Sequence, residues 1–216
     1  MERVIDWSPS CLPVVGGGLF PVRHVWCVGR NYAEHALEMG ADPEREPPVF
    51  FSKPGQSVVA DRRIRYPRTD NLHHEVELVV LLGLGGQVYG HAVGVDLTRR
   101  DVQSRAKQAG EPWELAKGFD QSGPVGEILP VGDWQPRSDC SISLEVNGQR
   151  RQGGLLGEMI WDVDELLARL SADVTLAAGD VIFTGTPAGV GPLQPGDAVR
   201  AEIQGLPPLE LTISER

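Results

Sequence analysis

The sequence predicts a mixed α/β fold dominated by β-structure. Its 216 residues include 26 glycines and 17 prolines, scattered along the whole chain, which break it into many short elements. Short apolar runs of strand-like composition recur between these breaks, and only about three segments have a helical pattern. The regular alternation of strands and helices that builds a doubly wound sheet is not seen. We therefore expect a sheet-rich fold with a few short helices.

Strands are expected wherever a short apolar run lies between turn residues. These runs occupy residues 24–28, 49–52, 75–82, 91–96, 141–146, 149–152, 181–184, 198–203 and 209–213. Asn147-Gly148 joins two of them and supplies the positive φ angles of a type I′ hairpin turn. Residues 1–22 contain Gly16-Gly17-Gly18 and are expected to form a loosely structured N-terminal arm, followed by a single domain over residues 23–216.

Three helices are expected, each with a recognisable end. The first covers residues 32–39 and ends at Gly40, and the second covers residues 98–109 and ends at Gly110. The third covers residues 162–170, with Asp162 and Glu165 spaced as a capping pair.

The composition is that of a globular protein in a reducing compartment. Hydrophobic residues make up 41% and charged residues 23%, and no apolar run approaches the roughly 18 residues of a membrane span. The acidic start, with Glu2 and Asp6, does not resemble a secretory signal. Cys11, Cys27 and Cys140 are odd in number and lack zinc-ligand spacing. We expect a cytoplasmic protein without a membrane partner.

The formal net charge of −10 disfavours binding to nucleic acid, because a negative field repels phosphates. The basic residues form only weak clusters, which we interpret as solvated surface. These clusters are Arg62, Arg63, Arg65 and Arg68; Arg99 and Arg100; and Arg150 and Arg151.

Two glutamates begin the strongest predicted strand. Glu75 and Glu77 are two residues apart, so they share one face of the strand, roughly 6.6–7 Å apart at the usual rise. An amphipathic strand with a wet face would explain the pair, but the residues that follow are apolar on both faces, which indicates a buried strand. Two buried carboxylates need a cation, which could be an arginine, a lysine or a metal ion.

A third acid, Asp96, ends the next predicted strand. If the two strands pair, Asp96 can reach both glutamates, and three carboxylates without histidine or cysteine favour Mg²⁺, Mn²⁺ or Ca²⁺ over zinc. Asp96 has an alternative role as the N-cap of the helix that begins at Thr98.

Several further residues have side chains suited to catalysis. His35 and Glu38 are three apart on a predicted helix, an arrangement that suits a general base and its orienting carboxylate, although such pairs also occur on plain surfaces. Lys117 lies among aromatic residues at 113–120, and a buried lysine needs an anionic partner. The loop 184–192, rich in glycine and proline, is either an anion-binding loop or a tight turn.

Together these segments resemble the fumarylacetoacetate hydrolase family, most closely its small acylpyruvase branch. The resemblance runs in order from about Arg23 to the C-terminus. It rests on residues 27–32 with His35 and Glu38, and on residues 48–54, 73–78, 96–103, 112–120, 146–148 and 179–192.

The resemblance implies a rolled mixed β-sheet, Mg²⁺ or Mn²⁺ as cofactor, a small 2-oxo acid as substrate and a homodimer. It implies these site residues: Glu75, Glu77 and Asp96 as metal ligands; His35 and Glu38 as the pair that activates water; Gln103 and Lys117 as catalytic residues facing the substrate; and Arg30, Lys53 and Thr186 as substrate-binding residues.

The activity implied is hydrolysis of a carbon–carbon bond in a 3-acylpyruvate, such as acetylpyruvate or fumarylpyruvate. Oxaloacetate decarboxylation or tautomerisation, and isomerisation of an unsaturated 2-oxo diacid, are alternatives that use the same enolate chemistry. A domain without catalytic activity is a third alternative. It is suggested by one departure from the family, since residues 83–90 are too few for the helix that relatives generally carry between the two ligand strands.

Overall fold

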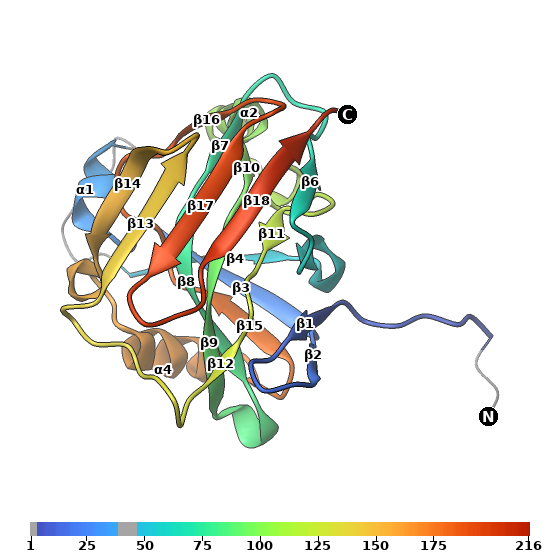
Figure 1. Cartoon of the computed structure of the whole chain (residues 1–216), viewed down its shortest axis with the longest axis vertical. Coiled ribbons are helices and arrows are strands. Elements are labelled where there is room, and N and C mark those ends of the chain that lie inside the picture. The colour runs from blue at the N-terminus through green and yellow to red at the C-terminus, as the bar shows by residue number, and fades with distance from the viewer. Residues whose placement is uncertain (1–3, 39–46) are drawn as a thin grey trace.

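Two large β-sheets pack face to face in the computed structural model, which describes residues 4–38 and 47–216 (Figure 1). The six-stranded sheet has the order β12 (Leu129–Pro130), β9 (Val88–Val95), β8 (Val76–Leu82), β15 (Asp180–Phe183), β3 (His24–Gly29) and β4 (Val49–Lys53). The five-stranded sheet has the order β14 (Gln149–Leu155), β13 (Ser141–Val146), β17 (Ala198–Ile203), β18 (Leu209–Ser214) and β6 (Arg63–Arg65). Each large sheet mixes parallel and antiparallel pairs, as expected from the resemblance.

Smaller elements surround the two sheets. A three-stranded sheet has the order β10 (Thr98–Arg99), β7 (Leu72–His74) and β16 (Gly191–Leu193). Two strand pairs complete the β-structure: β1 (Cys11–Pro13) with β2 (Leu19–Pro21), and β5 (Val58–Val59) with β11 (Gly123–Pro124). The α-helices of the described residues are α1 (Ala33–Glu38), α2 (Arg100–Ala109), α3 (Glu114–Lys117) and α4 (Val163–Asp173). In the part of the chain that the structure describes, no helix has the length and apolar character needed to cross a membrane.

Strand β8 lies at the centre of the core, and every one of its residues is buried. Leu78 and Val80 face the apolar cluster between the two large sheets, whereas Val79 and Leu81 face a second cluster on the other side of the six-stranded sheet. Because side chains alternate along a strand, β8 contributes to both clusters. The prediction of a central strand with two apolar faces is confirmed.

The predicted strands are present; those at 141–146 and 198–203 match in both bounds, and the others differ by at most three residues at an end. The third predicted helix is confirmed as α4, with Asp162 and Glu165 in the expected capping box. The second begins later than expected, at Arg100, because Thr98 pairs with His73 in a short strand; it ends as expected at Gly110, which has a φ of 68°. Arg99 therefore occupies the N-cap position, and the alternative role of Asp96 as N-cap is wrong.

The first predicted helix is present as α1, but its expected end at Met39 and Gly40 lies outside the described residues. The predicted Asn147-Gly148 turn is confirmed, with φ angles of 54° and 73°. The connection between β8 and β9 is short, as expected, and contains one 3₁₀ turn at Leu84–Gly86.

The expectation of a loosely structured arm is wrong for residues 11–21. Strands β1 and β2 form an antiparallel hairpin, and the three glycines at 16–18 lie in its turn with positive φ. Leu12 and Phe20 from this hairpin are buried in the second apolar cluster. Apolar residues at alternate positions thus dock the hairpin on the six-stranded sheet.

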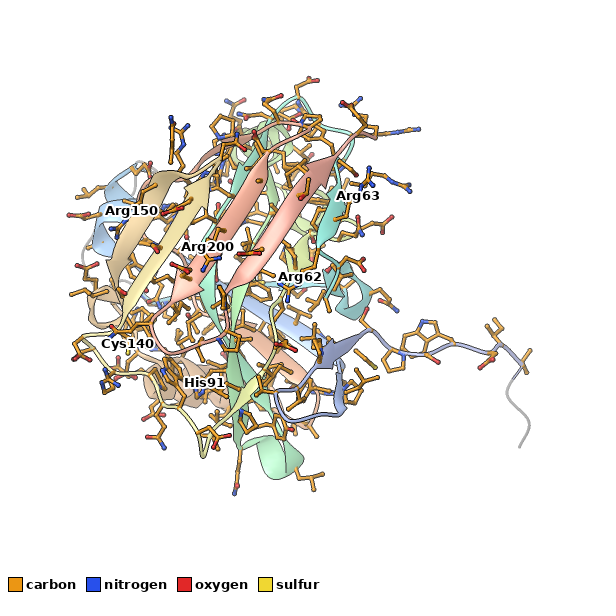
Figure 2. The ribbon with its side chains drawn as sticks, in the orientation of Figure 1. Arg62, Arg63, His91, Cys140, Arg150 and Arg200 are labelled. Carbon is orange, nitrogen blue, oxygen red and sulfur yellow. The ribbon has the colours of Figure 1, made fainter. Side chains whose placement is uncertain are left out.

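Most of the basic residues occupy exposed positions, as predicted. Figure 2 shows Arg63, Arg150 and Arg200 on the five-stranded sheet and Arg62 beside it, and all four are exposed. Arg100 is an exception and is buried in the site described next.

Candidate metal centre

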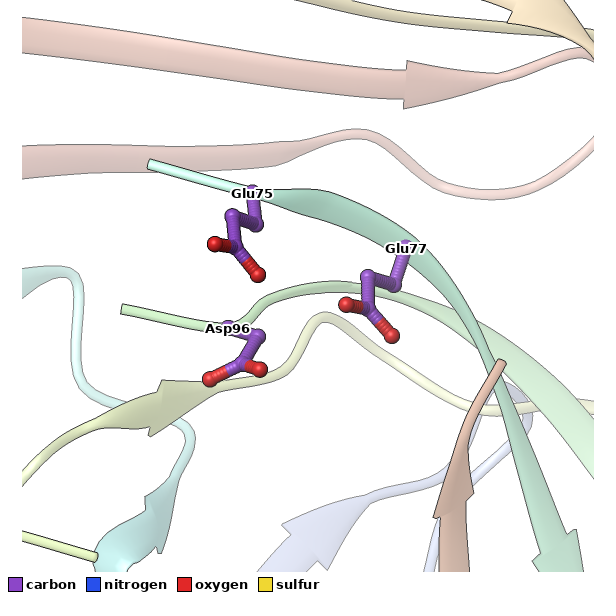
Figure 3. A group of neighbouring side chains, drawn as sticks. All are labelled: Glu75, Glu77 and Asp96. Carbon is purple, nitrogen blue, oxygen red and sulfur yellow. The ribbon is translucent and has the colours of Figure 1, made fainter. Parts of the chain in front are cut away.

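Three carboxylates converge at one end of β8 (Figure 3). Glu77 lies on β8, Glu75 lies just before it, and Asp96 lies just after β9. The antiparallel pairing of β8 with β9 places these positions side by side, and the backbone N–H of Asp96 donates to the carbonyl oxygen of Glu75 at 2.8 Å. One oxygen from each carboxylate lies within 4.8 Å of the others, and all three residues are buried. The predicted juxtaposition is confirmed.

Three cations compensate part of this negative charge. Nζ of Lys117 donates to Oε2 of Glu75 at 2.8 Å and to Oδ2 of Asp96 at 2.7 Å. The guanidinium of Arg100 lies 2.5 Å from Oε1 of Glu75, and Nζ of Lys53 lies 2.8 Å from Oδ1 of Asp96. Lys53 directs its hydrogen bonds to other oxygens, so its contact with Asp96 is an ion pair without hydrogen-bond geometry.

The carboxylates differ in how well their charge is compensated. Burial raises the pKa of Glu75, but Lys117 and Arg100 outweigh burial, so the pKa falls below its ordinary value. Burial also lowers the pKa of Lys117, and the charges of Asp96 and Glu75 outweigh it and raise that pKa.

Glu77 has no such partner. Its carboxylate accepts one hydrogen bond, from the backbone N–H of Gly185 at 2.6 Å, and it makes no ion pair with any described residue. Burial, together with the charges of Asp96 and Glu75, raises its pKa well above the ordinary value. A buried carboxylate in this position needs a further cation to be stable as an anion. Three carboxylate donors without a soft ligand suit a hard divalent ion, so the residues fit Mg²⁺ or Mn²⁺.

The predicted pair of His35 and Glu38 lies beside this centre. Nδ1 of His35 is 3.4 Å from Oε2 of Glu38, which also accepts a hydrogen bond from the N–H of Gly189 at 3.2 Å. His35 is buried, and burial lowers its pKa although the charges of Glu75 and Glu38 oppose the shift. A lowered pKa favours the neutral imidazole, which is the form that accepts a proton.

One cavity joins most of the predicted site residues. Seven of the ten predicted residues line it, namely Arg30, His35, Glu75, Glu77, Gln103, Lys117 and Thr186. Its other lining residues are Val28, Gly29, Phe51, Arg100, Lys107 and Trp113. Asp96, Glu38 and Lys53 do not line the cavity. Lys53, predicted to bind substrate, is fully buried behind Asp96, where its charge acts on that carboxylate.

The first turns of α2 contribute a residue that sequence reasoning misassigned. Arg100 was expected to be solvated, which is wrong, because it pairs with Glu75 and donates to Oε1 of Gln103 at 2.6 Å. Arg100, Gln103 and Lys107 follow the i, i+3, i+7 spacing of one helix face, and that face lines the cavity. This spacing was a signal that could have identified Arg100 and Lys107.

The loop that carries Thr186 is held by a buried glutamine. Nε2 of Gln152 donates to Oγ1 of Thr186 and to the carbonyl oxygen of Pro187, both at 2.8 Å. Its Oε1 accepts from the N–H of Val76 at 3.0 Å and contacts Nδ1 of His74 at 2.9 Å. Gln152 thus fixes the loop 184–192 against the start of β8.

A buried acidic triad with two members lining a cavity, beside a histidine of lowered pKa and several cations, is the arrangement of a metal-assisted enzyme. The profile of the family described as fumarylacetoacetate (FAA) hydrolase, C-terminal, matches residues 24–214. The chain belongs to the fumarylacetoacetate hydrolase family.

Relatives of two differently named kinds are similar over nearly the whole chain. A crystal structure of fumarylpyruvate hydrolase from Pseudomonas aeruginosa, in complex with Mn²⁺ and pyruvate, is 42% identical, covers 100% of both chains and has a TM-score of 0.96. Oxaloacetate tautomerase YcgM of Escherichia coli is 42% identical over 199 residues, which is 86% of this chain and 90% of that protein. The mitochondrial oxaloacetate tautomerase FAHD1 of Mus musculus is 40% identical over 196 residues, 85% of this chain and 88% of that protein.

Proposed function

We propose that the protein hydrolyses the carbon–carbon bond of a 3-acylpyruvate-type 2,4-dioxo acid, giving pyruvate and a carboxylic acid. The observation that carries this proposal is the placement of His35 in the same cavity as Glu75 and Glu77, which puts a neutral base beside a site for a divalent cation. The similar fumarylpyruvate hydrolase, crystallised with Mn²⁺ and pyruvate, supports it.

Glu75, Glu77 and Asp96 would hold Mg²⁺ or Mn²⁺ through carboxylate oxygens. When bound, such an ion acts as a Lewis acid that polarises the substrate's 2-oxo group and favours its enolate form.

His35 supplies the base for hydrolysis. Its imidazole takes a proton from a water molecule, and the water oxygen forms a bond to the C4 carbonyl carbon of the substrate. The C3–C4 bond then breaks, its electron pair goes to C3, and the proton on His35 returns to C3 to complete pyruvate. Glu38 fixes the ring through Nδ1, which leaves Nε2 to accept the proton from water.

Lys117 and Gln103 stabilise the oxyanion that forms when water attacks. Oε1 of Gln103 already accepts from Arg100, so its amide group is oriented with Nε2 as the free donor. Each oriented donor of this kind contributes a few kcal/mol to transition-state stabilisation in typical enzymes, roughly 2.7–4 kcal/mol. Thr186 and Arg30 are proposed to contact substrate carboxylate groups at the cavity wall.

Oxaloacetate tautomerisation is the second candidate. It is supported by the similar proteins of Escherichia coli and Mus musculus, which are both named oxaloacetate tautomerases. The reaction requires only that a proton leave the enol oxygen and a proton be added at C3, or the reverse, without attack by water. The same cavity could also serve oxaloacetate decarboxylation or isomerisation of an unsaturated 2-oxo diacid. A protein without catalytic activity would not need the cations and the histidine brought together here.

A substrate panel tests these proposals. Purified protein is loaded with Mg²⁺ or Mn²⁺ and assayed with acetylpyruvate and fumarylpyruvate for pyruvate release, and with enol oxaloacetate for conversion to the keto form. We expect pyruvate release that EDTA abolishes and added metal restores. If the protein turns over oxaloacetate and no acylpyruvate, tautomerisation is its activity and the proposal of hydrolysis is wrong. Activity that survives EDTA would exclude both metal-dependent reactions. The homodimer stays a prediction of the family resemblance, and the cytoplasmic location stays a prediction from the composition and cysteine content.

A further inference from the structure

A β-bulge in the five-stranded sheet directs a glutamine into the protein. Leu144 of β13 pairs with Gln152 of β14. The residue after Leu144 pairs with Arg150, so Arg151 is an extra residue that forms the bulge. Paired residues lie on the same face of a sheet, and Leu144 belongs to the apolar cluster between the two large sheets. Gln152 therefore faces the same interior, and it is 1% exposed although the three residues before it are exposed.

Two backbone groups fix the orientation of the Gln152 amide. The backbone nitrogen of Val76, which can only donate, lies 3.0 Å from Oε1. The carbonyl oxygen of Pro187, which can only accept, lies 2.8 Å from Nε2. If the amide were turned over, a donor would face a donor and an acceptor would face an acceptor. The positions of the amide oxygen and nitrogen are therefore determined by groups whose hydrogen-bond roles cannot change.

This orientation assigns the hydrogen-bond role of Thr186. Nε2 of Gln152 donates to Oγ1 of Thr186 at 2.8 Å, so the hydroxyl oxygen is the acceptor in this contact. A hydroxyl group also has one proton to donate, and no described residue accepts that of Thr186. Thr186 lines the same cavity as Glu75 and Glu77. The hydroxyl is therefore a hydrogen-bond donor that is available to a ligand in the cavity.

The bulge also contacts the loop that carries Thr186. A β-carbon on Gly189 of this loop would lie 2.2 Å from the carbonyl oxygen of Arg151, and Gly189 has a φ of 94°. Both the close approach and the positive φ require glycine. The loop therefore packs on the bulged backbone itself, which brings Thr186 within reach of the adjacent Gln152 amide.

We propose that Gln152 is a positioning residue, which fixes the Thr186 hydroxyl as a donor to the carboxylate of a bound 2-oxo acid. Gln152 does not line the cavity, so it acts on the ligand through Thr186. Without the amide, the hydroxyl would be free to turn toward acceptors of the loop, and the ligand would lose an oriented donor. This inference rests on the contact between Thr186 and a substrate carboxylate in the proposed function, and it names the donor and the acceptor in that contact.

Pyruvate binding to the Mn²⁺-loaded protein, measured by calorimetric titration, tests the role of Gln152. Thr186→Val removes the hydroxyl with little change of shape, and Gln152→Met removes the amide at nearly unchanged length. A hydrogen bond to a charged group is worth about 10-fold to about 150-fold in affinity, so Thr186→Val should weaken pyruvate binding by a factor in this range. Thr186→Ser, which keeps the hydroxyl, should stay within about 3-fold of the wild type, and Gln152→Met should weaken binding by about 5-fold or more.

A double variant separates action through the hydroxyl from a general effect on the loop. The effects of independent sites multiply, whereas effects transmitted through one shared group do not. In the Thr186→Val background, adding Gln152→Met should therefore change the pyruvate affinity by less than about 2-fold. The matched control is Gln149→Met, which removes an exposed amide of the same strand and should leave the pyruvate affinity unchanged.

Wild-type pyruvate affinity in the Gln152→Met variant would overturn the proposal. An equal loss with and without the Thr186 hydroxyl would also overturn it, because Gln152 would then act on the loop as a whole. A parallel loss of Mn²⁺ affinity, titrated without pyruvate, would assign the effect to the metal centre and overturn it too.

Pyruvate binding requires no turnover, so the result is independent of the proposed reaction. The expected coupling without any pyruvate release in the substrate panel would exclude hydrolysis and keep the role of Gln152. Hydrolysis together with wild-type pyruvate affinity in the Thr186→Val variant would exclude this role and keep the reaction.

Discussion

The ammonium group of Lys117 lies 2.7 Å from Oδ2 of Asp96, deep inside the protein. The same nitrogen lies 2.8 Å from Glu75, so one lysine bridges two of the three carboxylates. Because an unpaired buried ion costs several kcal/mol, the lysine and the two carboxylates stabilise one another, together with Arg100 and Lys53. The charge network therefore contributes both to folding and to the candidate chemistry.

Replacing Lys117 with methionine should destabilise the metal-free protein by about 3–5 kcal/mol, the usual cost of breaking a buried ion pair from one side. Added Mn²⁺ should recover part of this loss, because a divalent ion can compensate Glu75 and Asp96 in place of the ammonium. Urea unfolding with EDTA and with Mn²⁺ measures both quantities. A variant as stable as the wild type in EDTA would show that the network contributes little to the folded state.

Removing the charge of Glu77 should separate metal binding from folding. This carboxylate has a raised pKa and lies close to two other acids, so Glu77→Gln should leave the stability in EDTA unchanged or higher. The wild type should gain thermal stability on addition of Mn²⁺, by about 2.7 kcal/mol when the ion is at 100 times its dissociation constant. The variant should lose this gain and its activity. A Mn²⁺-induced shift of equal size in both proteins would remove Glu77 from the metal site.

The His35→Ala variant should distinguish hydrolysis from tautomerisation. General-base catalysis typically contributes 10²–10⁴-fold, so kcat for acylpyruvate hydrolysis should fall by about 100-fold or more. Activities on oxaloacetate that need no attacking water should fall less. The control is Glu34→Gln, which changes an exposed residue of the same helix. A variant that hydrolyses acylpyruvates at the wild-type rate would rule out His35 as the base.

Acid should destabilise the protein through a histidine far from the metal centre. His91 is buried against Trp134, and Nδ1 has no hydrogen-bond partner among the described residues. Burial lowers its pKa from 6.5 to about 4. Between these two values the unfolded chain binds a proton that the folded protein does not, so the free energy of unfolding falls as the pH falls. Well above pH 6.5 the imidazole is neutral in both states, and His91 has no effect on the pH dependence.

For one such histidine, the slope of the free energy of unfolding against pH approaches about 1.4 kcal/mol per pH unit. Urea unfolding of the His91→Phe variant from pH 7 to 4 should show a shallower dependence than the wild type. The pKa of His73 is also lowered to about 4, so His73 should still contribute to the pH dependence of stability in the variant. Identical slopes for the two proteins would mean that His91 is protonated without cost in the folded state.

The ligand positions were predictable because they depend on local geometry. Glu75 and Glu77 share a face through the two-residue period of a strand, and the short connection to β9 brings Asp96 alongside them. The capping pair of α4 and the turn at Asn147 are likewise set by neighbours in the sequence.

The contacts that sequence reasoning missed join distant segments. Gln152 touches Val76 and Thr186, which are 76 and 34 residues away, and no local pattern encodes either contact. Arg100 was misassigned because a basic residue at a helix start is usually solvated, and its burial depends on how α2 docks against Glu75. The hairpin at residues 11–21 was missed because its glycine run suggested freedom, whereas its apolar residues dock on the sheet.

Strand β8 lies between two apolar clusters, and this position constrains the metal-ligand residues more strongly than the exposed residues of the cavity. Moving a ligand carboxylate would require repacking on both faces of the strand, which makes the metal end resistant to gradual change. Lys107 and Arg30 line the same cavity with exposed side chains, where a substitution typically changes the stability by less than about 0.5 kcal/mol. A scaffold arranged in this way can acquire a new substrate by changes at the entrance alone, with its reactive centre inherited intact.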